Sequence, residues 1–346
     1  MIKRLSIQSK LMLMLLLVSI SSIIAIASLG YSSGQEILRN SIFNQLVSLR
    51  ETRGYEIETY FENVRGQIQT TSEFQTVIEA MKGFKTAFQE LEQEQIPVTW
   101  NDRLKSYYNF SFLPILNKNF PINGERNLFT YFPSNIAARY LQYHYIAANP
   151  NNVDEKSLLN FPQDGSKYSQ LHNTYHPVFR KFIETFGYGD LLLVDADTGN
   201  IVYTVGKEVD FATNLYTGPY SSSNLAELVR ETKKGRDSTI VNITDFESYS
   251  GVYGKPSAFI ASPIFDNSQL IGILVFQISA QEINQIITGG QNWQRDGLGD
   301  SGEVYLVGED KTMRSISRFL VEEPKDYYTP IAANGLTTAE IDQIKN

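Results

Sequence analysis

The apolar positions of the chain change pattern along its length, and the first pattern is an uninterrupted run. The stretch from Leu11 to Leu29 contains no charged residue. At ~1.5 Å per residue, a helix of this length spans a hydrocarbon core of roughly 30 Å. We therefore expect a transmembrane helix over residues 11–29, preceded by a short tail over residues 1–10.

Beyond residue 30 the apolar residues recur every three or four positions, which is the spacing of one helix face. This stripe runs from Ile42 to Leu91 and is followed by Pro97. The pattern predicts one long, continuous helix over residues 30–97. The stripe would either pair with a second copy, giving a homodimer, or pack on later helices of the same chain.

Between residues 187 and 278 the pattern becomes short β-branched and aromatic runs separated by turns. Such runs, flanking turns like Asp197-Thr198-Gly199-Asn200, predict two antiparallel hairpins with one helix over about 224–232 between them. We expect a small antiparallel sheet with helices on one face. The predicted strands span residues 191–195, 201–205, 259–265 and 270–278.

Two further regions surround this sheet. Residues 98–186 are rich in aromatic residues and should be helical in pieces, over about 100–117, 134–148 and 166–186. Their tyrosines are expected to pack against the sheet module, with a carbohydrate-binding face as the alternative. A helix is also expected over residues 280–288, because Ser279 can cap it and Gly289-Gly290 can end it.

The last part of the chain repeats the beginning of the sheet module. Leu306-Val307 with Asp310 four residues after the leucine matches Leu193-Val194 with Asp197 four residues after its leucine. The repeat lacks the helix and the closing hairpin of the first copy, and an incomplete sheet leaves an unpaired edge. We therefore expect an incomplete second module and a chain that is the front part of a longer protein.

Together these patterns predict an α+β fold with separate helical and sheet regions. The expected divisions are a cytoplasmic tail (1–10), a transmembrane helix (11–29), a long membrane-proximal helix (30–97), a helical aromatic-rich region (98–186), a first sheet module (187–290), and a linker with an incomplete second module (291–346).

The charges that flank the apolar run predict its orientation. Lys3, Arg4 and Lys10 precede it, whereas the charges after it begin at Glu36. The positive-inside rule then places the amino terminus in the cytoplasm and the body outside. The alternative is a cleaved signal peptide, which the small residues at 25–27 would suit, although the run is longer than a usual signal core.

Composition narrows the class of protein. The chain has 346 residues, 42% of them hydrophobic, which is ordinary for a folded protein. Its net charge of -8 argues against a nucleic-acid partner, because binding a polyanion needs clustered lysine and arginine. It has no cysteine, which excludes disulfides, thiolate metal sites and cysteine nucleophiles.

The sequence offers little catalytic chemistry. His172 and His176 are four residues apart, on one helix face, but further metal ligands in register are missing, so we expect packing histidines and no metal or cofactor. No Gly-x-Ser-x-Gly string or other nucleophile motif surrounds the three histidines, which argues against a secreted hydrolase.

A sheet curved over short helices leaves a concave pocket, in which inward-facing polar side chains can orient a small molecule. Each candidate also has a simpler interpretation: Lys207 and Asp210 would otherwise pair at the surface, and Tyr220 would pack in a turn. The candidate ligand-binding residues are Tyr203, Lys207, Asp210, Thr213, Asn214, Tyr220, Asp245, Tyr249, Ser262 and Gln277.

Four strings resemble the extracytoplasmic double-Cache sensors of bacterial receptors: GYGDLLLVDADTGNIVYTVGKEVDFATNLYTGPY, PSAFIASPIFD, IGILVFQIS and GLGDSGEVYLVGEDKTMRSISRFL. The order of membrane span, long helix and strand modules is also similar. With YLQYHYIAANP and YHPVFRKFIETFGYGD included, the strings cover most of residues 131–323. It is closest to the sensory half of membrane-bound class III adenylate/guanylate cyclases. The resemblance implies PAS-like modules at the periplasmic side of the inner membrane that bind a small molecule.

In that family a second membrane helix, a HAMP linker and a cyclase domain follow the sensor, so this chain itself would not be an enzyme. A histidine kinase or a chemoreceptor is an alternative output, and a membrane-anchored, dimerising structural protein is an alternative function. Amino-acid-sensing members have an aspartate where Gln277 stands, and an Arg-x-Trp-Tyr string where residues 213–216 read Thr-Asn-Leu-Tyr. The resemblance therefore favours an uncharged or carboxylate-bearing ligand.

Overall fold

The structure is a computed structural model that describes residues 6–119 and 126–333. Lys3 and Arg4, on which the predicted orientation partly rests, lie outside the described residues. Residues 334–346 of the predicted second module lie outside them as well.

The described residues form two compact units, and the long helix α1 (Ile7–Ser72) contributes to both. In the first unit, Arg53 forms ion pairs with Glu56 at 2.7 Å and with Asp296 at 2.5 Å. The first unit holds residues 6–56 and 292–302, and the second holds residues 57–119, 126–291 and 303–333.

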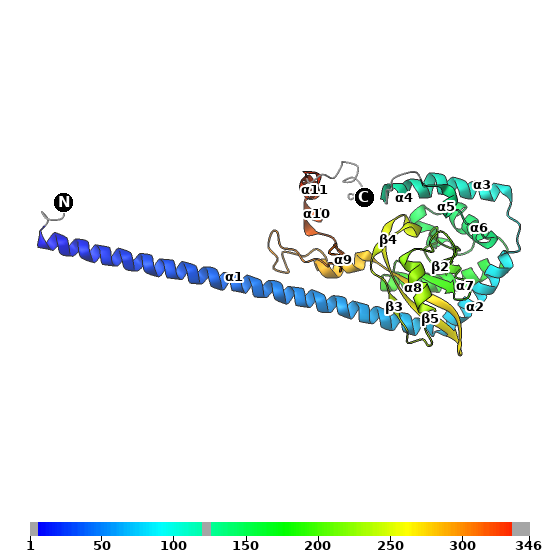
Figure 1. Cartoon of the computed structure of the whole chain (residues 1–346), viewed down its shortest axis with the longest axis horizontal. Coiled ribbons are helices and arrows are strands. Elements are labelled where there is room, and N and C mark those ends of the chain that lie inside the picture. The colour runs from blue at the N-terminus through cyan, green and yellow to red at the C-terminus, as the bar shows by residue number, and fades with distance from the viewer. Residues whose placement is uncertain (1–5, 120–125, 334–346) are drawn as a thin grey trace. The chain divides into compact units, whose positions relative to one another are not determined.

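Helix α1, drawn in blue in Figure 1, contains the apolar run between Leu11 and Leu29. The side chains of this run are exposed. Within the described part of the chain, α1 is the one helix that is long and apolar enough to cross a membrane, judged by length and composition. The helix predicted from the apolar run is therefore present.

The single continuous helix predicted over residues 30–97 is wrong. Helix α1 ends at Ser72, and a separate helix α2 covers Gln75–Leu91. Phe74 between them has an extended backbone, with φ of -64° and ψ of 131°. Neither a glycine nor a proline stands at the break, so the local sequence gives no sign of it. The chain turns at this break, and α2 packs across the sheet.

The sheet has six antiparallel strands. Five follow the order β2-β1-β6-β5-β3, and β4 pairs with the first three residues of β5. The two predicted hairpins are both present as β1–β2 and β5–β6, and β1 pairs with β6 along its whole length. The strands are β1 (Asp190–Asp195), β2 (Ile201–Thr204), β3 (Asn242–Ile243), β4 (Glu247–Tyr249), β5 (Lys255–Asp266) and β6 (Gln269–Ile278).

The helices cover both faces of the sheet, and the prediction of helices on one face is wrong. Leu191 and Leu193 of β1 belong to a core with α1, α2 and α7, whereas Leu192 and Val194 belong to a second core with α3, α4 and α8. Every residue of β1 is buried. A strand that is apolar at successive positions is typical of a sheet buried on both faces, and the run LLLV in β1 carries that signal.

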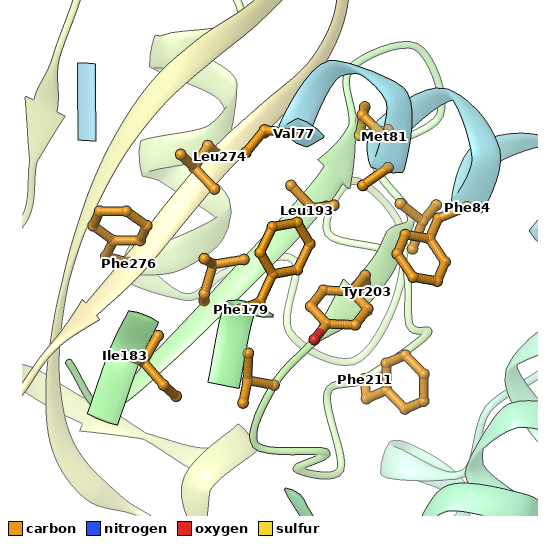
Figure 2. Close-up of a cluster of buried hydrophobic side chains, with 14 of the residues drawn as sticks. Val77, Met81, Phe84, Phe179, Ile183, Leu193, Tyr203, Phe211, Leu274 and Phe276 are labelled. Carbon is orange, nitrogen blue, oxygen red and sulfur yellow. The ribbon is translucent and has the colours of Figure 1, made fainter. Parts of the chain in front are cut away.

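Figure 2 shows part of the first core, where Val77 of α2 lies beside Leu274 of the sheet and Phe84 lies beside Tyr203. The approach is close at Gly272 of β6. A Cβ atom added there would lie 2.7 Å from Cγ of Met81, so α2 can pack this close because residue 272 is glycine.

The helical pieces predicted within residues 98–186 are confirmed, although π-helical turns extend two of them. Ser279 caps the helix that follows it, as expected, and Ser223 caps α8. The remaining helices are α3 (Val98–Tyr107), η2 (Tyr108–Phe112), α4 (Leu113–Asn119), α5 (Leu128–Tyr131), α6 (Ile136–Gln142), η3 (Tyr143–Ala147), η4 (Val153–Leu158), α7 (Lys167–Phe186), α8 (Asn224–Thr232), η5 (Ser250–Val252), α9 (Ala280–Thr288), α10 (Arg318–Glu322) and α11 (Pro324–Ala333).

The predicted second copy of the hairpin is reduced to a tight turn. Val307 and Met313 form one isolated antiparallel bridge, and the amide of Arg314 donates to the carbonyl of Leu306 at 2.8 Å. In the described residues after 303, two short helices follow this turn and no named strand does. The boundary of a second module stays a prediction.

Candidate functional site

Three of the sequence candidates meet in the core between the sheet and helices α3 and α4. Asp210, in the loop after β2, accepts a hydrogen bond on Oδ2 from the hydroxyl of Tyr249 at 2.8 Å. The ring of Tyr220 lies 5.8 Å from that of Tyr249. Asp210 is 4% exposed and both tyrosines are 1% exposed. A carboxyl group and two phenols are therefore enclosed together.

Two polar atoms of this cluster have no partner in the described part of the chain: Oδ1 of Asp210 and the hydroxyl of Tyr220. Buried polar atoms are nearly always hydrogen-bonded, so each exception asks for an explanation such as a water or a ligand. An acceptor and a hydroxyl in one enclosure can hold a small polar molecule from two sides. We take this cluster of Asp210, Tyr220 and Tyr249 as the candidate site.

Burial controls the charge of the site. It raises the pKa of Asp210 to about 7, against the opposing effect of the hydrogen bond from Tyr249. Burial also raises the pKa of Tyr220 and of Tyr249 well above the usual value, so both phenols keep their protons. Near neutral pH the Asp210 carboxyl group is poised between its neutral and charged forms, and a ligand with an N–H or O–H donor would favour the charged one.

The backbone around Asp210 is held by residues that the sequence analysis did not single out. The amide nitrogen of Gln142 donates to the carbonyls of Val209 (2.9 Å) and Phe211 (2.8 Å), one on each side of Asp210. The hydroxyl of Tyr108 donates to Oε1 of Gln142 at 2.8 Å. Tyr108 opens the π-helix η2, a type of turn that is frequent at functional sites.

Thr213 has a structural role beside the candidate site. Its hydroxyl donates to the backbone carbonyl of Asp210 at 2.6 Å, so it braces the loop and has no hydroxyl proton left for a ligand. Asn214 likewise shapes a turn, donating to the carbonyl of Thr198 at 2.8 Å and accepting from the amide of Tyr216 at 2.8 Å.

Lys207 lies on the other face of the loop, in a cage of aromatic rings. Its ammonium lies 4.4 Å from the ring centroid of Tyr203, 5.0 Å from that of Phe211 and 5.6 Å from that of Tyr145. It donates to the carbonyl of Thr204. Figure 2 shows Tyr203 and Phe211, two walls of this cage. Lys207 is thus neither at the surface nor paired with Asp210.

Lys207 is fully buried, and burial lowers its pKa to about 7 although the nearby charge of Asp190 opposes this. Asp190 opens strand β1 and accepts from the amides of Leu191 (2.7 Å), Val205 (2.8 Å) and Gly206 (2.9 Å). Burial raises the pKa of Asp190 to about 6. Asp190 was not among the residues predicted from the sequence, although an aspartate directly before the apolar run of β1 was a usable signal.

Tyr203 connects this cage to the histidines of α7. Its hydroxyl donates to Nδ1 of His176 at 2.6 Å, and Nε2 of His176 donates to the carbonyl of Ser157 at 2.6 Å. The rings of His172 and His176 stack 4.1 Å apart. Among the described residues, no group of three or more His, Cys, Asp or Glu side chains is placed to hold a metal ion. Both nitrogens of His176 therefore have roles in packing.

The last three candidates lie away from the cluster. Asp245 forms a two-point ion pair with Arg314, at 2.8 and 2.9 Å, and lines an open hollow of about 600 Å³. The hydroxyl of Ser262 lies 3.0 Å from that of Ser72. The amide of Gln277 donates to the hydroxyl of Ser257 at 3.0 Å. Each of these side chains is engaged by the protein itself.

No protein-family model and no curated protein matches the chain. Solved structures with low similarity are sensor or ligand-binding domains. The sensor domain of the V. cholerae histidine kinase DctB is 16% identical, over 56% of this chain and 60% of its own, with a TM-score of 0.26. The ligand-binding domain of the Campylobacter jejuni chemoreceptor Tlp3, in complex with 4-methylisoleucine, is 10% identical over 76% and 80%, with a TM-score of 0.31.

The ligand-binding domain of the Pseudomonas fluorescens chemoreceptor CtaA, in complex with L-serine, is 14% identical over 65% of this chain and 81% of its own, with a TM-score of 0.27. The matched part spans 60% of the DctB sensor domain. At these identities and TM-scores, the similarities establish neither the fold nor the function of this chain.

Proposed function

We propose that the chain is the ligand-sensing region of a membrane-anchored signalling protein. One observation carries this proposal: the helix with the apolar run is also part of the core of the sheet unit. Ile57, Val64 and Ile68 of α1 are buried in the core that α2, α7 and one face of the sheet share. The candidate site belongs to the second core, on the other face of the same sheet, so a ligand there would act on α1 through the strands that the two cores share.

The proposed ligand is a small polar molecule that binds beside Asp210 and Tyr220. It carries at least one N–H or O–H group for Oδ1 of Asp210 and an acceptor for the hydroxyl of Tyr220, which satisfies the two buried atoms that have no partner. Because Asp210 and Tyr220 are buried, entry requires the loop between β2 and α8 to open.

We propose that the sheet unit lies outside the cytoplasm, as the charges at Lys3, Arg4 and Lys10 favour. A single-cysteine variant tests this, because the chain has no cysteine of its own. In spheroplasts, a membrane-impermeant maleimide should label Thr185→Cys on the exposed face of α7 and should not label Lys10→Cys. Labelling of Lys10→Cys alone would reverse the orientation.

The type of output domain is a separate proposal. The resemblance favours a nucleotide cyclase, with a histidine kinase or chemoreceptor as alternatives and a homodimer as the signalling unit. We propose no catalytic step for this chain.

The binding experiment uses the full chain in lipid nanodiscs and a panel of metabolites, with thermal unfolding as the measurement. We expect at least one polar metabolite to raise the midpoint, since a ligand that binds only the native state stabilises it. Tyr220→Phe removes only a hydroxyl without a partner, so the variant should fold normally and lose most of the ligand response.

Tyr55→Phe is the matched control, because Tyr55 is 70% exposed, and it should respond like the parent. If no metabolite shifts the midpoint, or if Tyr220→Phe responds like the parent, sensing at this site is excluded. A purely structural protein would give the first of these results, no shift with any metabolite.

A further inference from the structure

A separate hollow of about 360 Å³ lies on the helical side of the same unit, away from the Asp210 cluster. Its walls come from α3, from the π-helix η3 and from the loop that leads to α7. The main lining side chains are Trp100, Tyr143, His144, Leu159, Phe161 and Pro162.

The aromatic side chains of this pocket are arranged regularly. The indole of Trp100 stacks on Tyr143 with ring centroids 4.5 Å apart and an interplanar angle of 7°. His144 meets the indole edge-on at 4.7 Å and 81°. Tyr143 and His144 open η3, and π-helical turns are frequent at functional sites. The pocket is therefore walled by ring faces and edges, which favour further aromatic contacts.

Hydrogen bonds from side chains to backbone carbonyls hold the walls of the pocket in place. Nε of Arg103 on α3 donates to the carbonyl of Ala147 at 2.9 Å, which joins α3 to η3. The amide nitrogen of Asn149 donates to the carbonyls of Tyr145 (2.9 Å) and Lys156 (3.0 Å), which fixes the start of the loop. A pocket whose walls are already held loses little freedom when a ligand binds.

One polar atom of the lining residue His144 has no partner. Nε2 of His144 is buried and makes no hydrogen bond in the described part of the chain. Burial lowers the pKa of His144, so the ring is neutral at neutral pH and one of its nitrogens can accept a hydrogen bond. Lysine, arginine, aspartate and glutamate are absent from the described side chains that line the pocket.

We propose that this pocket binds a small, neutral aromatic molecule with a single N–H or O–H donor, whose ring packs on the aromatic walls and whose donor bonds Nε2 of His144. A charged ligand would have no counter-charge among the lining side chains. A sugar would need more polar partners than His144 and Gln163 supply. This site is independent of the proposed sensing site, because none of its lining residues belongs to the Asp210 cluster.

The test uses indole as the probe, with the full chain labelled with 5-fluorotryptophan in lipid nanodiscs. The chain has two tryptophans, Trp100 and Trp293, so the ¹⁹F spectrum has two resonances, and Trp100→Phe assigns them. We expect indole to move the Trp100 resonance saturably and to leave the Trp293 resonance in place. Indole that only dissolves in the lipid would not single out Trp100.

Two matched changes test the hydrogen bond. His144→Phe keeps a ring and removes the acceptor, and 1-methylindole keeps the ring and removes the donor. Each change should weaken binding about fivefold. Together they should cost little more than either alone, since both remove the same bond. Phe110→Leu, at an exposed aromatic residue outside the pocket, should bind indole like the parent.

Two results would overturn the proposal. One is a Trp100 resonance that does not respond to indole at all. The other is a response that is equal for indole and 1-methylindole and unchanged by His144→Phe, because His144 would then make no contact with the ligand. Neither result bears on sensing at Asp210, which Tyr220→Phe tests separately.

Discussion

The hydroxyl of Ser72, the last residue of α1, lies 3.0 Å from the hydroxyl of Ser262 in strand β5, and both side chains are buried. The hydroxyl of Ser72 also donates to the carbonyl of Gln69 at 2.8 Å, so Ser262 is the donor in the bond between the two serines. This bond joins the helix that carries the apolar run directly to the centre of the sheet.

Ser262→Ala should lower the free energy of unfolding by about 1 kcal/mol, because it leaves the buried hydroxyl of Ser72 without this partner. The double variant Ser72→Ala/Ser262→Ala should cost less than the sum of the two single variants, since no buried group is then left unpaired. Urea unfolding in detergent measures all three. Ser106→Ala, at an exposed serine of α3, serves as the control, and strictly additive effects would contradict the bond.

Gly272→Ala should destabilise the protein by about 1–3 kcal/mol, because the new methyl group would overlap the side chain of Met81. Met81 is flexible but fully buried, so it has little room to move. Combined with Met81→Ala, the alanine at 272 should cost much less. Unfolding curves of the four members of this cycle give the coupling energy.

Gly66→Ala is the matched control for this cycle. Gly66 lies in the interior of α1 with no atom near its added Cβ, so alanine there should stabilise the helix by up to about 1 kcal/mol. If Gly272→Ala proved as harmless as Gly66→Ala, the close packing of α2 on β6 would be wrong.

Asp210→Asn should change how stability depends on pH. Burial raises the native pKa of Asp210 from 3.8 to about 7, so the unfolded chain loses this proton first as the pH rises. The buried carboxyl group therefore leaves the free energy of unfolding nearly unchanged at about pH 4. Above about pH 7 it lowers that free energy by its full effect, which is at most about 4 kcal/mol. The variant should match the parent at low pH and exceed its stability at about pH 8.

The measurement is the difference in unfolding free energy between variant and parent at several pH values, so that other groups cancel. Asp237→Asn, at an exposed aspartate, is the control. A difference that stays constant from about pH 4 to about pH 8 would show that Asp210 titrates normally.

Lys207→Met should have the opposite pH dependence. Burial lowers the native pKa of Lys207 from 10.5 to about 7. Its charge therefore lowers the free energy of unfolding by the full amount below about pH 7, and this loss disappears as the pH approaches 10.5. Replacing a buried charge with an apolar side chain often stabilises a protein by about 1–4 kcal/mol. Asp190 keeps its three backbone donors in the variant.

We expect the methionine variant to be more stable than the parent at about pH 7 and to lose this advantage by about pH 10. Lys181→Met, at an exposed lysine of α7, is the control in the same titration. A strong loss of stability at neutral pH would mean that the contacts of the ammonium outweigh its burial.

The elements that local signals specify were predictable from the sequence. Turn residues mark the β1–β2 hairpin, and Ser279 caps α9, so these bounds were read directly. The break at Phe74 was not predictable, because the apolar stripe continues across it and the turn is imposed by packing of α2 on the sheet. The fold class was correct, whereas the second face of the sheet was missed.

The candidate site was predictable in part, because the sequence shows the residues but not the contacts that the fold brings about. Asp210, Tyr220 and Tyr249 were singled out as polar residues near the sheet, and the structure brings them together. Gln277 and Ser262 looked similar in sequence, but Ser257 on the neighbouring strand bonds Gln277 and Ser72 of α1 bonds Ser262. Tyr108 and Gln142 come from distant helices, and no local pattern indicates that they hold the Asp210 loop.

The aromatic cage around Lys207 holds an ammonium group. A free amine should therefore be able to occupy the cage when the lysine side chain is removed. Lys207→Ala removes Cγ, Cδ, Cε and Nζ, which together match n-propylammonium, and leaves the faces of Tyr145, Tyr203 and Phe211 without a cation. Added n-propylamine should then raise the unfolding midpoint of this variant by an amount that grows with the amine concentration, and leave the parent unchanged. In chemical terms, the lysine side chain is a tethered ligand whose free equivalent can take its place.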